Sequence, residues 1–218
     1  MSPLLANIVL DELDKELERR GHRFCRYADD CNIYVKSQKA GERVMESIRR
    51  FIAQKLRLKV NETKSKVAKS GECTFLGHTI GSGGKLWMAK KSKERMKKRI
   101  KELTRRNRGR KLEAVIGELN RTLGGWLVYF RLANAKNWCS ETEQWLRRKL
   151  RCYRLKQCKR RIGIARFLME NGCREYQAWE LAMSRKGWCR MALSPQAHRA
   201  MGAEWFRKRG LIPMAIPK

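Results

Sequence analysis

The chain has 218 residues, of which 42% are apolar and seven are tryptophan, so it is large enough and apolar enough to bury a core. Lysine and arginine number 52 against 21 acids, for a net charge of +31, which indicates a polyanionic partner. This composition excludes a disordered tail. The sequence has no apolar stretch of about 18 residues, the length needed to span a membrane, so nucleic acid is a better candidate partner than a membrane.

The first segment predicts a helix that runs to about Leu17 and ends near Gly21. Ser2 and Pro3 are typical of an N-cap and of the first helical position. Apolar residues then recur every four positions on one face, at Leu5, Val9, Leu13 and Leu17. The segment lacks the basic region of a signal peptide.

Residues 24–35 predict a β-hairpin with two adjacent acids, Asp29 and Asp30, at or beside its turn. Fixed, adjacent carboxylates are hard oxygen ligands of the kind that hold Mg²⁺ together with substrate phosphates. Metals placed in this way can drive an in-line phosphoryl displacement. Because aspartate is also common in turns, a plain structural turn is the alternative interpretation.

The following residues predict a helix over 42–56, a short strand over 56–61, and a basic loop that contains Lys64. A second hairpin is predicted from a strand over 73–80, a glycine-rich turn at 81–84 and a returning strand at 86–88. Together with the first helix and hairpin, these elements predict an α+β unit with an antiparallel sheet.

From Lys90 onward the pattern predicts helices alone. The first helix begins near Ser92, and the second spans Leu112 to Phe130. The third is predicted to turn Leu146 and Leu150 inward and most of its arginines, including Arg151, outward. These three helices predict a small bundle with one strongly basic side. Residues 87–218 hold 35 basic and 10 acidic side chains, against 17 and 11 in residues 1–86, so the helical part is the main electrostatic footprint.

Beyond residue 161 the pattern predicts a helix over about 164–183 and a last helix over 196–209. The eight cysteines include no C-x-x-C pair, which favours reduced thiols in a cytosolic protein over a zinc site or a disulfide framework.

Several segments resemble those of group II intron-encoded reverse transcriptase/maturases of the compact bacterial lineage. Those that resemble the later palm motifs are residues 2–17, residues 26–30, Asn61 with Lys64, and residues 75–77. Those that resemble the thumb helix and the C-terminal maturase region are residues 123–130, residues 179–187, and Ser194 with Pro195. The resemblance implies a partial reverse transcriptase palm at 1–88, an all-α thumb bundle at 89–161, and a helical maturase, RNA-binding region at 162–218.

The resemblance implies an RNA-directed DNA polymerase and intron maturase of a mobile element, located in the bacterial cytoplasm. Asp29 and Asp30 are then the Mg²⁺-binding catalytic carboxylates, and Lys64 is the catalytic lysine that meets the triphosphate. The residues implied to contact the primer or nucleotide are Tyr27, Ala28, Phe75, Leu76 and Gly77. The cations expected to contact RNA are Arg105, Arg106, Arg108, Arg147, Arg148, Arg151, Arg154, Arg185 and Lys186.

The implied partners are structured intron RNA, an RNA template with its DNA primer, deoxynucleotides, and an N-terminal half that is missing here, but no membrane. The fingers and the first palm motifs, which carry another catalytic aspartate, have no counterpart in the sequence. We therefore expect an incomplete two-metal Mg²⁺ site and an isolated chain that is inactive as a polymerase. The alternatives are a non-catalytic RNA-binding splicing cofactor and a generic basic nucleic-acid-binding protein.

Overall fold

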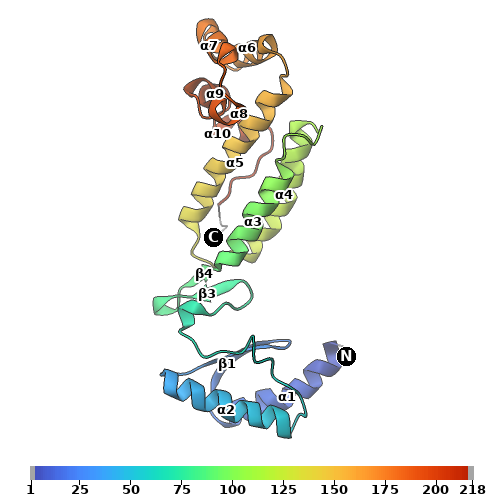
Figure 1. Cartoon of the computed structure of the whole chain (residues 1–218), viewed down its shortest axis with the longest axis vertical. Coiled ribbons are helices and arrows are strands. Elements are labelled where there is room, and N and C mark those ends of the chain that lie inside the picture. The colour runs from blue at the N-terminus through green and yellow to red at the C-terminus, as the bar shows by residue number, and fades with distance from the viewer. Residues whose placement is uncertain (1–2, 216–218) are drawn as a thin grey trace. The chain divides into compact units, whose positions relative to one another are not determined.

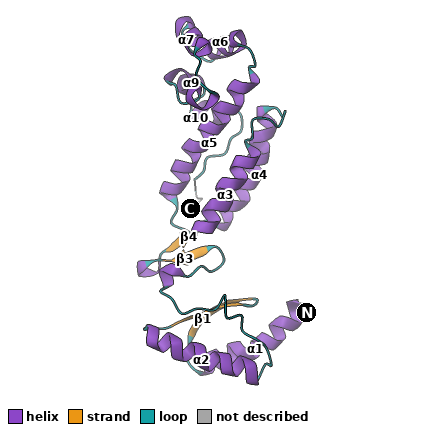
Figure 2. Ribbon diagram, viewed as in Figure 1, coloured by secondary structure: helices purple, strands orange, loops and turns teal. Residues whose placement is uncertain are grey.

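The computed structural model of the chain describes residues 3–215 and divides into two compact units, which meet in sequence between Lys85 and Leu86 (Figure 1). The predicted N-cap residue, Ser2, lies outside the described residues. Helices make up most of the regular structure of these residues, and the strands form two two-stranded sheets (Figure 2). The predicted α+β class is confirmed. Within residues 3–215, no helix has the length and apolar character needed to cross a membrane.

The first unit packs a β-hairpin and two long helices around a small core. Its elements are α1 (Pro3–Arg19), β1 (Arg23–Tyr27), β2 (Asp30–Tyr34), α2 (Gln38–Gln54), the short 3₁₀ turns η1 (Ser70–Glu72) and η2 (Ser82–Gly84), and β3 (His78–Ile80). Leu13 and Leu17 of α1 and Ile48 of α2 are buried together, and Phe24 and Ile33 of the hairpin pack against them. Burial of these apolar faces holds the hairpin against the helices.

Two strand predictions in this unit are wrong. Residues 56–61 form no strand, because Arg57 adopts a positive φ of 53° that interrupts an extended run. The strand predicted over 73–80 is shortened to β3, because Leu76 and Gly77 both have positive φ and reverse the chain two residues earlier. Phe75 and His78 close that tight turn with two backbone hydrogen bonds of 2.9 and 2.8 Å.

The second unit begins with β4 (Leu86–Met88) and continues as three long helices, α3 (Lys90–Leu103), α4 (Leu112–Tyr129) and α5 (Lys136–Gln157) (Figure 1). The helix α4 packs against both α3 and α5. The residues of α4 that face this core are Leu112, Val115, Ile116, Leu119, Leu123 and Leu127. Their spacing of three and four positions matches the helical period, which explains why both ends of this helix could be predicted closely.

Five shorter helices complete the second unit, namely α6 (Arg161–Glu170), α7 (Glu175–Met183), α8 (Trp188–Met191), α9 (Pro195–Ala200) and α10 (Ala203–Arg207). The single helix predicted over 164–183 is wrong, since Gly172 with φ 86° separates α6 from α7. The last predicted helix is likewise divided between α9 and α10, at Met201 and Gly202. Phe206 of α10 is fully buried in the same core as α4 and α5.

Candidate metal-binding turn and nucleic-acid interface

The turn between β1 and β2 presents the two acids that the sequence singled out. Tyr27 pairs with Asp30 in the antiparallel register, which leaves Ala28 and Asp29 as a two-residue loop. Ala28 has a φ of 52°, in the left-handed region, where glycine is the usual residue at the first position of such a turn. Tyr27, Asp29 and Asp30 are all exposed, so the hairpin holds both carboxylates in solvent at its tip.

Arg26 fixes this turn against α1. Its guanidinium donates hydrogen bonds of 2.7 and 2.5 Å to the two carboxylate oxygens of Asp14, and of 2.9 Å to the carbonyl oxygen of Ala28. A further bond of 3.1 Å reaches the side-chain oxygen of Asn7. The hydrogen bonds that Arg26 donates to Asp14 raise the pKa of Arg26 above its ordinary value. No role was predicted for Arg26 from the sequence, although a cation two residues before the loop, opposite an acid-rich helix, was a signal for this contact.

Replacing Arg26 by lysine is expected to destabilise the first unit. Lysine keeps the charge but cannot make two parallel hydrogen bonds to Asp14 and reach Ala28 as well. The Arg26 and Asp14 side chains are only 13% and 23% exposed, so we expect a loss of about 1–2 kcal/mol in the free energy of unfolding, measured by urea denaturation. Arg23→Lys, at the exposed start of β1, is the matched control. Equal stability of the two variants would show that Arg26 does not hold the turn.

The donor chemistry of the turn suits Mg²⁺. This ion is commonly held by one or two carboxylates, with water and substrate phosphates in its other positions. Asp29 and Asp30 supply two such carboxylates, and among residues 3–215 neither takes part in an ion pair that would neutralise it. Over the same residues, no three or more His, Cys, Asp or Glu side chains gather into a metal-binding group.

The other predicted polymerase residues lie elsewhere in the first unit. Lys64 is exposed in the loop after α2, where its backbone N–H donates to the carbonyl and side-chain oxygens of Asn61, both at 3.2 Å. Phe75 is half-buried, and Leu76 and Gly77 form the tip of the turn that precedes β3. In the part of the chain that is described, no hydrogen bond or ion pair joins these residues to Asp29 or Asp30.

The predicted RNA-contacting cations fall into two groups. The first is exposed and takes part in no ion pair among the described residues: Arg105, Arg106, Arg185 and Lys186. The second is half-buried and mostly supports the fold. Arg108 bonds to Glu118 at 2.8 Å, Arg147 pairs with Glu143, and Arg154 lies 4.2 Å over the ring of Phe167. Arg148 is half-buried and has no acidic partner among the described residues.

The prediction that Arg151 faces outward is wrong. This side chain is only 5% exposed, and it donates hydrogen bonds of 3.0 and 3.2 Å to the carbonyl oxygens of Ala192 and Met201. Residues around α8 and α9 cover this side of α5, which the apolar period of α5 alone does not reveal. Burial, and then the nearby charge of Arg147, lower the pKa of Arg151 to about 10.

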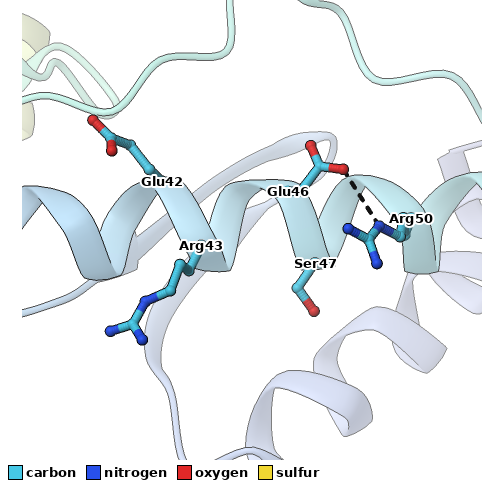
Figure 3. Close-up of a pocket in the computed structure, with 5 residues that line it drawn as sticks. All are labelled: Glu42, Arg43, Glu46, Ser47 and Arg50. Atoms are coloured by element: carbon cyan, nitrogen blue, oxygen red, sulfur yellow. Dashed lines mark hydrogen bonds and ion pairs between the residues drawn. The ribbon is translucent and has the colours of Figure 1, made fainter.

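A separate pocket of about 340 Å³ lies on α2 and is lined by Glu42, Arg43, Glu46, Ser47 and Arg50 (Figure 3). Its acidic and basic side chains are balanced, and Glu46 and Arg50 pair at 3.3 Å. All five lining residues come from one helix, and none of the predicted site residues is among them. This pocket therefore has no net charge that would select a charged ligand.

Comparison with known protein families gives two matches. Residues 1–80 match the reverse transcriptase (RNA-dependent DNA polymerase) family, and this stretch contains the acidic turn and the turn at Leu76 and Gly77. Residues 93–169 match the group II intron maturase-specific domain, and this stretch contains most of α3, all of α4 and α5, and nearly all of α6. No curated protein matches the chain.

Proposed function

Because this chain belongs to the group II intron-encoded reverse transcriptase/maturases, we propose that it serves RNA-directed DNA synthesis with its first unit and grips intron RNA with its second. The observation that carries the first part is the acidic turn. Its two exposed carboxylates have no ion-pair partner among residues 3–215, and they lie on a hairpin that Arg26 holds against α1. The turn lies within the stretch that matches the reverse transcriptase family. In this proposal the first unit is part of the palm and the helices α3 to α5 are the thumb.

The proposed reaction is attack of a primer 3′-hydroxyl on the α-phosphate of a deoxynucleotide, with pyrophosphate as the leaving group. Asp29 and Asp30 would hold Mg²⁺, which when bound supplies charge stabilisation to the reacting phosphate. Lys64 would bring its exposed ammonium group to the triphosphate and donate a proton toward the pyrophosphate. The turn at Leu76 and Gly77, with Tyr27 and Ala28, would position the primer end.

RNA binding is the part of the proposal that rests on charge. The second unit holds 35 basic and 10 acidic residues, and exposed cations such as Arg105, Arg106 and Lys186 have no acidic partner in the part of the chain that the structure describes. Such cations bind the phosphate backbone, and a rigid helical surface adds recognition of RNA shape. The proposed partners are structured intron RNA and the RNA template with its DNA primer.

The same observation favours a second candidate, a splicing cofactor that binds intron RNA without catalysis. In this case the second unit carries the activity, and the acidic turn plays no part in it.

Primer extension distinguishes the two. An RNA template, a DNA primer, deoxynucleotides and Mg²⁺ are mixed with the chain. DNA product that depends on the template and the metal would support polymerase activity and would overturn the expectation of an incomplete two-metal site. RNA binding without any extension would support the cofactor.

A further inference from the structure

A cleft of about 570 Å³ lies in the second unit beside α5. Its lining includes Trp145, Arg147, Arg148 and Arg151 of α5, with Leu193 and His198 from the chain that covers this helix. We call it the α5 cleft. It brings three arginines and an aromatic ring to one concave surface, in contrast to the balanced pocket on α2.

The α5 cleft has positive charge that the fold does not neutralise. Arg147 is paired with Glu143, but in the described part of the chain no carboxylate forms an ion pair with Arg148 or Arg151. Arg151 is almost fully buried, and a buried cation without a counter-ion is unfavourable. An anion that enters the cleft offsets this desolvation. The lining carboxylate Glu141 is exposed, so it remains solvated.

His198 adds no charge to the cleft. Its Nε2 atom lies 3.1 Å from a guanidinium nitrogen of Arg151, which can only donate, so Nε2 accepts the hydrogen bond and the imidazole is neutral. Burial, followed by the charges of Arg151 and Arg147, lowers the pKa of His198, in agreement with that geometry. Among the residues that line the cleft, the positive charge therefore comes from Arg147, Arg148 and Arg151.

The cleft also offers an apolar surface beside these cations. Trp145 is half-buried against the main core, with the ammonium group of Lys149 5.7 Å from its ring centroid, and Leu193 is 52% exposed. Aromatic rings and arginine planes are the surfaces on which unpaired RNA bases stack, while arginines bind the phosphates. Bases in a duplex are stacked and paired, so they do not present such a surface to a cleft.

We propose that the α5 cleft receives a single unpaired nucleotide of RNA, with its phosphate at Arg148, above the buried charge of Arg151, and its base against Trp145. This inference rests on the proposed RNA binding by the second unit, and it names the RNA feature that is recognised, a bulged or looped-out nucleotide.

Two RNA hairpins that differ only in one bulged nucleotide test the proposal. Their affinities for the full chain are measured by fluorescence anisotropy at one salt concentration. We expect the bulged hairpin to bind about tenfold more tightly, as expected for one phosphate contact with a stacked base. Arg148→Gln and Trp145→Leu should each reduce this preference to nearly none. Arg166→Gln, an exposed arginine of α6 outside the cleft, is the matched control and should keep the preference.

A wild-type chain that binds both hairpins equally, or a preference that survives in both cleft variants, overturns the proposal. Arg148 is half-exposed, so its replacement tests the cleft even if Trp145→Leu disturbs folding, which circular dichroism reveals. A chain that binds neither hairpin contradicts the proposed RNA binding itself, and this result is distinct from a loss of preference.

Discussion

Asp29→Asn is expected to remove metal binding at the β1-β2 turn and to slow any RNA-templated primer extension that the chain supports by about a thousandfold, or ~4 kcal/mol of transition-state stabilisation. The amide keeps the size of the side chain but loses the negative charge that a hard cation requires. Because Asp29 is exposed in a loop that Arg26 holds through the backbone, the fold should be unchanged. The measurement is the rate of primer extension at saturating Mg²⁺.

Asp11→Asn is the matched control, since it makes the same chemical change on the exposed face of α1. It should leave extension unchanged. Metal binding is measured independently of activity by adding iron(II), which can replace Mg²⁺. Bound iron(II) produces hydroxyl radicals that cleave the chain near the site. We expect Mg²⁺-sensitive cleavage near Asp29 in the unaltered chain and in Asp11→Asn, but not in Asp29→Asn. Equal cleavage in Asp29→Asn, or measurable extension at an equal rate, would show that the acidic pair is an ordinary turn.

Removing four exposed cations of the second unit together is expected to weaken RNA binding by roughly a hundredfold at fixed salt. The variant replaces Arg105, Arg106, Arg185 and Lys186 by glutamine. These side chains are exposed and take part in no ion pair among the described residues, so their loss removes phosphate contacts without removing internal support. Each lost contact should make the slope of log affinity against log salt shallower by about 0.7–0.9. The affinity is measured by anisotropy over a series of salt concentrations.

The control for this variant removes the same charge from the first unit, by replacing Lys36, Lys39, Arg43 and Arg50 by glutamine. All four residues are exposed, so the fold should again be preserved. A much smaller loss of affinity is expected if the second unit is the RNA-binding surface. Similar losses of affinity in the two variants would indicate that RNA binding depends on the total charge of the chain and not on the surface of the second unit.

Local patterns were sufficient to predict the elements that carry the candidate site. The aromatic and β-branched residues around Asp29 and Asp30 correctly predicted a hairpin, because strand preference and a short loop are local properties. The helix predicted over 112–130 corresponds to α4, which ends at Tyr129, because its apolar residues keep a regular helical period. Residues 56–61 show an equally regular alternation of apolar and polar side chains, but the positive φ of Arg57 interrupts the extended backbone that a strand needs.

Long-range contacts between polar groups could not be predicted in the same way. The bond from Arg26 to Asp14 joins a strand to a helix 12 residues earlier, and neither side chain changes a periodic pattern. Arg151 belongs to a run of cations on α5, and its burial depends on the position of α8 and α9, about 40 to 50 residues later. The α5 cleft also depends on the position of the chain around α8 and α9, so it could not be predicted from the sequence.

We propose that this chain recognises intron RNA and is not merely a basic protein that binds any polyanion. The most direct test compares its affinity for a folded group II intron RNA with its affinity for duplex DNA of equal length, at the same salt concentration. We predict binding to the RNA that is at least about tenfold tighter, because RNA shape and unpaired nucleotides add to the phosphate contacts. Equal affinity for both nucleic acids would contradict the claim.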